Sequence, residues 1–200
     1  MSLRSTLEVL FFRQLTGLTS RLRIQFHRFM GMSIGTGCRF ERVRVRRPAN
    51  IRIGDSNALT EGCWLWPVDD RVSATRIHIG DSNYFNRDVM IDACNEIRIG
   101  SHNMFGPGVY ITDSNHTMPT EGRLADAPMD SGKVVIGNGC WIGAKAIILK
   151  DVILGDRCVV GAGAVVTRSV SAGAVVAGVP ARPIGDARSA RGAVAVAAHD

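Results

Sequence analysis

The stretch IGNGCWIGAKAIILKDVILGDRCVVGAGAVVTRS, residues 136–169, repeats an aliphatic residue at every sixth position. The repeated positions are Ile136, Ile142, Ile148, Leu154, Val160 and Val166. A period of six does not fit the 3.6-residue repeat of a helix, but it suits short strands in which alternate side chains share a face. Three such hexapeptides make one triangular coil, and stacked coils bury a continuous aliphatic column. The stretch therefore predicts an all-β solenoid.

Earlier copies of the hexapeptide begin at Ile34, Ile53, Ile79 and Ile99. A Gly follows most of these aliphatic residues, and we expect it to serve turns with unusual backbone angles. The fifth position should also point inward, and it holds small residues at Cys38, Cys63, Cys140, Ala146, Cys158 and Ala164. An ordinary β-sandwich is the competing interpretation. Six consecutive aliphatic residues at a spacing of six argue against a β-sandwich.

Two segments interrupt the repeat. WPVDDRVSATR, residues 66–76, lengthens one coil. The second interruption follows Ile111. The next aliphatic residue of the repeat should stand at position 117, which is Thr117, but the repeat resumes only at Ile136. We expect the polar segment 117–133, which contains Pro and Gly, to be a loop excursion from the coil wall. Insertions in solenoids map to loops on one face, which is often the binding face.

An amphipathic helix is expected ahead of the first coil, because apolar residues recur there at three-to-four spacing. They are Leu3, Leu7, Leu10, Phe11, Leu15, Leu18, Leu22, Phe26 and Phe29. The helix would cap the open end of the solenoid, or it would lie on an anionic membrane. We therefore divide the chain into an N-terminal helical cap (1–33), a β-helix (34–185) and a flexible tail (186–200).

The charge of the chain is concentrated at its front. Residues 1–52 hold eleven Arg and two Glu, a net charge of +9, whereas the whole chain carries +6. Such a region favours contact with phosphates, an anionic lipid surface or an acidic polymer, or it is a solvated basic face. It lacks interleaved aromatic residues, so we expect no nucleic-acid partner.

The cysteines and the apolar segments of the chain indicate its cellular compartment. The five cysteines form no C-x-x-C pair, which favours small reduced core residues in a cytosolic protein over disulfides or metal ligands. No apolar stretch is long enough for a membrane span. The first residues lack a secretory cleavage pattern, while an organellar transit peptide stays open. We expect a cytoplasmic protein, with peripheral contact to the inner face of the membrane as an option.

The segment VVIGNGCWIGAKAIILKDVILGDRCVVGAGAVVTRSVSAGAVVAGVPARPIG, residues 134–185, resembles the hexapeptide-repeat acyltransferases. The resemblance extends over about residues 34–185, and its specific motifs are WIG, GAGAVVTRS, GVPAR and the region before the loop. It is closest to the sugar O-acetyltransferases of the galactoside and maltose type. It implies a left-handed parallel β-helix, acetyl-CoA as co-substrate, a sugar acceptor, and homotrimers whose sites lie between subunits.

Acyl transfer to a hydroxyl needs a base, donors for the developing oxyanion, and positioning of both substrates. His116 is the histidine that stands where the coil gives way to the excursion, and it matches the family's catalytic histidine in position. The others are His27 on the proposed helix, His78 facing outward, His102 in a corner and His199 in the tail. We expect His116 to be the general base, unless it is a loop histidine bonded to a neighbour.

The resemblance also implies residues for the acceptor. Asn86 and Asp92 match polar positions near the family's acceptor site, although Asn and Asp also favour corners for their turn chemistry. Asp113 is close to His116 in sequence and is a candidate partner for its ring or for the acceptor. Trp141 should point outward, either beside the cleft or in an interface between subunits.

For the donor, the resemblance implies coenzyme A along the outside of the C-terminal coils. Gly143, Ala144 and Ala162 would meet the pantetheine arm, with a backbone N–H near Gly143 as oxyanion donor. The adenine and phosphates would meet Thr167, Arg168 and Arg182, where solvation of a surface Arg is the alternative. Arg168 stands where the family more often has Lys, which keeps the charge but not the shape.

The same fold occurs in proteins with other functions. The zinc-dependent carbonic anhydrases share the fold but need three histidine ligands, with a pair at H-x4-H spacing that this chain lacks. We therefore expect no metal requirement. Cys140 lies in the inward slot, so it is poorly placed as a nucleophile. A sugar hydroxyl of a surface polysaccharide or its precursor is the acceptor we favour, and an amino sugar or an antibiotic is the alternative acceptor. A non-catalytic scaffold is the alternative function.

Overall fold

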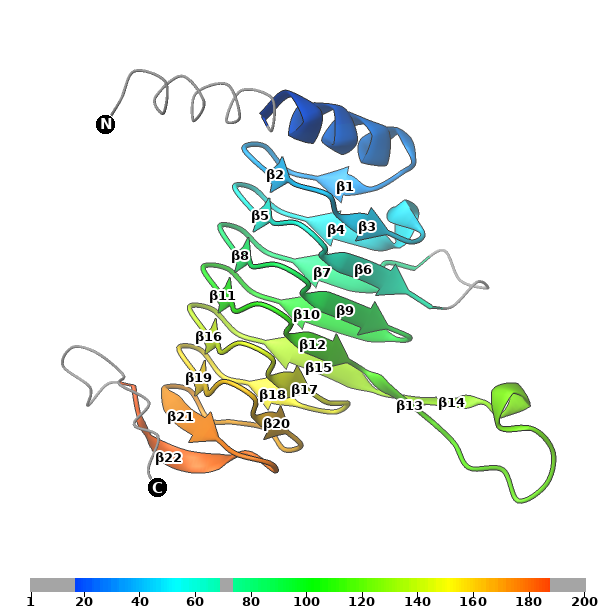
Figure 1. Ribbon diagram of the computed structural model, residues 1–200, viewed down its shortest axis with the longest axis vertical. Helices are drawn as coiled ribbons and strands as arrows, with labels where there is room; N and C mark the ends of the chain where they lie inside the picture. The colour runs from blue at the N-terminus through cyan, green and yellow to red at the C-terminus, as the bar shows by residue number, and fades with distance from the viewer. Residues whose placement is uncertain (1–16, 69–73, 188–200) are drawn as a thin grey trace, which may run out of the picture.

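Each predicted coil folds into three short strands, and the coils stack into a left-handed parallel β-helix (Figure 1). The computed structural model describes residues 17–68 and 74–187. Sheet A contains β1 (Ser33–Ile34), β4 (Ile51–Ile53), β7 (Ile77–Ile79), β10 (Glu96–Ile99), β15 (Lys133–Ile136) and β18 (Ile153–Leu154).

The other two walls follow the same order. Sheet B contains β2 (Arg39–Phe40), β5 (Ala58–Leu59), β8 (Tyr84–Phe85), β11 (Met104–Phe105), β16 (Trp141–Ile142), β19 (Val159–Val160), β21 (Ala174–Ala177) and β22 (Arg182–Asp186). Sheet C contains β3 (Arg44–Val45), β6 (Trp64–Pro67), β9 (Met90–Ala93), β12 (Tyr110–Thr112), β17 (Ile147–Ile148) and β20 (Val165–Val166). Within these sheets the strands pair in parallel, except that β22 runs antiparallel to β21.

The core is a set of vertical columns, one on the inside of each wall. In sheet A, Ile53 pairs with Ile79, and Ile99 pairs with Ile136. The column in sheet B is aromatic in its middle, where the rings of Phe85 and Phe105 stack with centroids 4.6 Å apart. Every repeated aliphatic side chain thus lies over its equivalent in the next coil, as the period of six predicts.

A ladder of buried asparagines fills the corner between sheets A and B. Asn57 Oδ1 accepts hydrogen bonds from the backbone N–H and the side-chain amide of Asn83, both at 3.0 Å. Asn83 Oδ1 accepts from the Asn103 N–H at 2.9 Å, and Asn103 Oδ1 from the Cys140 N–H at 2.7 Å. These residues occupy the fifth hexapeptide position, which other coils fill with the small Cys and Ala side chains noted in the sequence. Their amides satisfy backbone groups that the corner would otherwise bury unpaired.

The role expected of the glycines at the second hexapeptide position was wrong. Left-handed backbone angles occur instead at fourth positions, for example at Ser56 (φ 57°) and Lys145 (φ 56°). The second-position glycines are required by crowding between coils. A Cβ at Gly155 would lie 2.5 Å from the backbone nitrogen of Ala172, which is closer than a carbon atom can approach.

We therefore expect Gly155→Ala to lower the free energy of unfolding by about 1–3 kcal/mol, because the added methyl group forces two coils apart. Denaturant unfolding measures this. Gly17→Ala is the matched control, since a Cβ there meets no atom within 4 Å, and it should stay within about 0.5 kcal/mol of the parent. Equal stability of the Gly155 variant and the parent would contradict the crowding argument.

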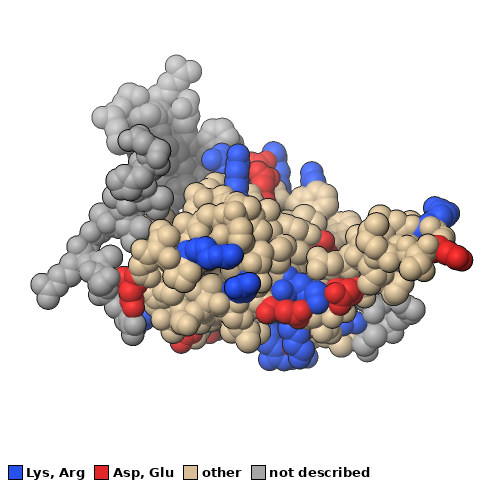
Figure 2. Space-filling view, turned by 90° about the horizontal axis from the view of Figure 1, so that it is seen from below, with Lys and Arg blue, Asp and Glu red and all other residues tan. Residues whose placement is uncertain are grey.

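The excursion is a hairpin arm rather than a loop, and it begins earlier than expected. Strand β13 (Ser114–His116) pairs antiparallel with β14 (Met129–Ser131), and the turn between them contains the 3-10 helix η2 (Leu124–Asp126). Lys133, expected in the excursion, already belongs to β15. Seen from the C-terminal end, the arm projects sideways from the body (Figure 2).

The helix formed by residues 17–29 lies across the N-terminal end of the solenoid (Figure 1). Ser20, Ile24 and His27 are buried on its inner side. The Phe40 backbone N–H donates to Ser20 Oγ at 2.8 Å, and Arg28 donates to the Ile34 carbonyl at 2.9 Å. No helix of the described residues is long and apolar enough to cross a membrane. The helix caps the first coil, but Leu18, Leu22, Phe26 and Phe29, which helped to predict it, are exposed. The other apolar residues of the pattern, Leu3, Leu7, Leu10, Phe11 and Leu15, lie outside the described residues.

Candidate active site

A groove of about 390 Å³ follows the outer face of sheet B and the corner after it. Its walls are outward side chains of the β8, β11, β16 and β19 strands, and its floor is formed by glycines and alanines of successive corners. The structure brings five of the predicted site residues together here: Asn86, Trp141, Gly143, Ala144 and Ala162. Trp141 points outward and is 45% exposed.

Apart from Asn86, sequence reasoning missed the residues of the groove that come from earlier coils. Tyr84, Met104, Gly106 and Pro107 line it as well. The signal lies in the register: Met104 pairs with Trp141, so Gly106 is the equivalent of Gly143 one coil earlier. Aligning the coils on one another, rather than reading them one at a time, would have found these residues.

One backbone donor near the expected oxyanion site, the N–H of Gly143 itself, takes part in the bonding between coils. The Gly143 N–H donates to the Val160 carbonyl at 2.7 Å, so it is already used by the coil ladder. The backbone N–H groups of Ala144 and Ala162 donate to no carbonyl within residues 17–68 and 74–187. A ligand carbonyl or oxyanion in the groove would therefore find its donor at Ala144 or Ala162.

His116 lies on a different side of the molecule. It is exposed on β13, opposite Met129, and β13 continues from β12 in sheet C. In Figure 1 the arm is at the right, whereas the sheet B strands that carry the groove are at the left. His116 is not among the residues that line the groove. One chain alone does not place this histidine over its own groove.

Asp113 has a structural position that sequence distance did not reveal. Its carboxylate accepts backbone hydrogen bonds from Cys94 at 2.7 Å, Asn95 at 2.8 Å and Glu96 at 2.6 Å. The side chain is fully buried, and burial raises the pKa of Asp113 although the three N–H groups act to lower it. This geometry argues against direct contact of Asp113 with an acceptor or with the His116 ring.

The same residue anchors the root of the arm. The Gly132 N–H donates to the Asp113 carbonyl at 2.7 Å, and the side-chain amide of Asn95 donates to the Gly132 carbonyl at 2.8 Å. Farther out, Lys150 forms an ion pair with Asp130 of β14 at 3.2 Å. The root of the arm and β14 are thus tied to neighbouring coils, and β13, which carries His116, is held through its pairing with β14.

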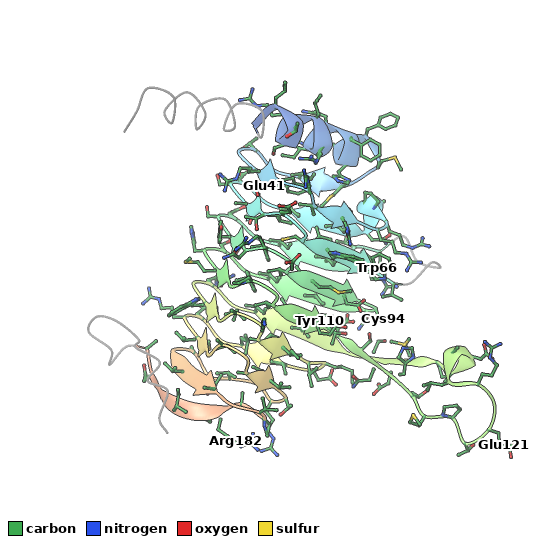
Figure 3. All side chains as sticks on the ribbon, in the orientation of Figure 1. Glu41, Trp66, Cys94, Tyr110, Glu121 and Arg182 are labelled. Carbon is green, nitrogen blue, oxygen red and sulfur yellow. The ribbon has the colours of Figure 1, made fainter. Side chains whose placement is uncertain are left out.

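Asp92 lies beside the arm and not in the groove. It pairs with Thr112 at the end of β12, from which the arm departs. The Tyr110 hydroxyl donates to Asp92 Oδ2 at 3.1 Å, and burial raises the pKa of Asp92. Its Oδ1 has no hydrogen-bond partner among the described residues. Figure 3 shows Tyr110 near this root, together with Cys94. Asp92 therefore lies on the same side of the molecule as the arm that carries His116, whereas Asn86 lies in the groove with Trp141.

The predicted nucleotide contacts fall near the C-terminal end. Arg168 and Arg182 line a second cavity of about 250 Å³, whereas Thr167 lines neither cavity. Both arginines are exposed, and Figure 3 places Arg182 at the lower end of the solenoid. They are available to an anion, although no phosphate position is defined by the side chains themselves.

The remaining candidates offer no second centre. His78 Nε2 is 3.9 Å from a Glu96 oxygen on sheet A, His102 is a corner residue with φ 61°, and His199 lies outside the described residues. No three His, Cys, Asp or Glu side chains within the described ranges are grouped to hold a metal ion. Burial raises the pKa of the Cys140 thiol to about 11, so it is a poor nucleophile.

We expect Asp113→Ala to speed hydrogen exchange of the backbone amides of residues 94–96 at least tenfold, because their common acceptor is lost. The free energy of unfolding should fall by about 1–3 kcal/mol. Asp126→Ala is the control, since Asp126 is exposed on the arm and its ion pair with Arg123 is long, at 3.9 Å. Unchanged exchange in the Asp113 variant would show that its carboxylate does not hold the root of the arm.

Comparisons of the sequence with known proteins agree with this architecture. Residues 133–168 match the family model described as bacterial transferase hexapeptide (six repeats). Over 111 residues the chain is 44% identical to a Dictyostelium discoideum protein named as an acetyltransferase, covering 54% of this chain and 56% of that protein. Over 124 residues it is 34% identical to the galactoside O-acetyltransferase of Escherichia coli, covering 62% and 61%. The chain thus spans less than two thirds of the length of these relatives.

The structural comparison extends over more of the chain. An N-acyltransferase from Bacillus cereus, solved with dTDP and coenzyme A, matches with a TM-score of 0.68 over 81% of this chain and 88% of its own. The identity is 20%, so this match shows the fold alone. The repeats, the three parallel walls and these matches agree with one another. This chain is a hexapeptide-repeat β-helix that is similar, over residues 133–168, to the bacterial hexapeptide transferases.

Proposed function

We propose that this protein is an acetyl-CoA-dependent O-acetyltransferase that acts on a sugar hydroxyl. The observation that carries the proposal is the groove on sheet B, which is open, mainly apolar and floored by glycines and alanines. A thin, extended thioester arm fits such a floor, where side chains larger than a methyl group are missing. The similarity to proteins named acetyltransferase supports the same chemistry.

The donor would lie along the groove toward the C-terminal end. The backbone N–H groups of Ala144 and Ala162 are the hydrogen-bond donors for the amides and the thioester carbonyl of coenzyme A. Arg168 and Arg182, exposed beyond the groove, are the cations for its phosphates. Thr167 adjoins Arg168 in sequence and keeps its expected place near the adenine as part of this proposal.

His116 is the proposed general base. Its imidazole takes the proton of the acceptor hydroxyl while that oxygen attacks the thioester carbonyl carbon. A C–O bond forms, the carbonyl oxygen gains charge, and the Ala144 N–H stabilises it. The C–S bond then breaks, the thiolate takes the proton back from the imidazolium, and an acetyl ester and coenzyme A leave. Atoms and charge balance without a covalent enzyme intermediate.

Two copies of the chain complete the site in this proposal. His116, Asp92 and the arm lie on the side of sheet C, while the groove lies on sheet B. A ring in which sheet C of one subunit faces sheet B of the next would bring the histidine over the neighbour's thioester. Head-to-tail contacts form a ring when the rotation between subunits closes, and the ring we propose is the homotrimer that the family resemblance implies.

The acceptor would bind between these two halves. Asp92 is partly exposed beside the arm, and Asn86 offers an amide at the rim of the groove. Both bond readily to hydroxyl groups, and the exposed indole of Trp141 supplies an apolar face for a sugar ring. A sugar of a surface polysaccharide or its precursor, made on the cytoplasmic side, is the acceptor class we favour.

The test is thiol release from acetyl-CoA with a panel of sugars, including amino sugars. His116→Ala should lower acceptor-dependent release by about 100-fold or more, since general base catalysis contributes at least that factor. His78→Ala is the control, because His78 lies on sheet A and belongs neither to the lining of the groove nor to the strands of the arm. It should retain the parental rate.

The remaining outcomes distinguish the alternatives. Release that requires an amine rather than a hydroxyl acceptor would move the assignment to N-acetyl transfer. Release that survives His116→Ala would remove the histidine from the mechanism. If neither coenzyme A binding nor thiol release is measured, the chain is a non-catalytic scaffold.

A further inference from the structure

The N-terminal helix, residues 17–29, carries an apolar stripe on the side away from the solenoid. Its members recur at intervals of four, four and three, so they share one helix face. They are Leu18, Leu22, Phe26 and Phe29, with exposed fractions of 57%, 63%, 59% and 87%. The buried face of the same helix, around Ile24, lies on the other side. This stripe is a larger apolar surface than an isolated exposed side chain.

The stripe lies at one extremity of the molecule. The helix crosses the end of the solenoid, beyond β1 and β2 (Figure 1). A flat surface can therefore contact the whole stripe without meeting the walls or the arm. Met30, just after the helix, is 48% exposed and adds to the same end of the chain.

The charge around the stripe has one sign. Residues 17–40 contain four Arg and no Asp or Glu. Arg21 is exposed and Arg23 is partly exposed, and by helical spacing they lie on the two sides of the stripe. Arg28 is directed to the first coil instead, where it donates to backbone carbonyls. Long basic side chains beside an apolar face suit an interface of acyl chains and anionic headgroups.

The same pattern continues in the preceding sequence. Leu3, Leu7, Phe11 and Leu15 follow one another at intervals of four, and the charged residues between them are Arg4, Glu8 and Arg13. The spacing of apolar and basic residues is therefore not confined to the described helix. It is typical of a segment that lies in the plane of a membrane surface.

We propose that the stripe and its flanking arginines dock this protein on an anionic phospholipid bilayer. The helix would lie in the plane of the headgroups, with Leu22 and Phe26 toward the acyl chains. Docking of a second copy on the stripe is disfavoured, because it would bring arginines of like charge together without an acid between them. The proposal does not depend on acyl transfer, since no residue of the groove or the arm takes part.

Cosedimentation with vesicles tests the proposal. The full chain should bind vesicles of phosphatidylcholine with about 30% phosphatidylglycerol at least tenfold more tightly than phosphatidylcholine alone, and about 0.5 M salt should weaken that binding. Leu22→Glu with Phe26→Glu should reduce binding at least tenfold. Ile153→Glu is the matched control, since Ile153 is 55% exposed on sheet A, far along the chain, and it should bind as the parent does.

Three results would overturn the proposal. The parent protein does not bind anionic vesicles, or the double variant binds as well as the parent. The third is a fall in the mass of the parent assembly on the double substitution, without any vesicle binding, which would mean that a second copy covers the stripe. Arg21→Gln with Arg23→Gln provides a second variant that leaves the apolar surface intact; it should lose the preference for anionic lipid.

Discussion

The stacking of one coil directly over the next is the constraint on which the rest of the structure depends. It places Ile99 over Ile79 and Ile136 over Ile99, and it leaves no room for a Cβ between corners, as at Gly155. The same constraint shapes the groove, because its floor consists of corners that crowding keeps small. The small corner residues that allow the coils to stack therefore also leave backbone N–H groups accessible to a ligand in the groove.

The walls of the solenoid could be predicted from the sequence because they depend on a period within each coil. The contacts between coils could not. Asn57, Asn83 and Asn103 read as ordinary turn residues until the register places each over the next. The N-terminal helix was predicted, but its packing face was not, for a related reason. Its apolar period defined a face, but not which side the solenoid would cover, and Ser20 and Ile24 took that place.

The candidate site was predicted only in part, because the sequence reveals features within one coil and not the contacts between coils. Spacing identified the break at His116 and the outward Trp141, since both are visible within one coil. It could not reveal that Asp113 is buried under the turn at residues 94–96, because that contact joins two coils. Nor could it assign Asp92 to the side of the arm. The division of polar groups between sheets B and C is the reason why we propose a site shared by two chains.

That shared site is the central claim, and mixed assemblies test it most directly. Chains with His116→Ala lack the base, and chains with Ala144→Phe have a filled groove, so each should be inactive alone. When the two are co-expressed in equal amounts, about a quarter of the sites should combine an intact histidine with an intact neighbouring groove, if the halves come from different subunits of a closed ring. Recovery of about a quarter of the parental activity is the predicted result. Mixed assemblies that form but stay inactive would contradict the account.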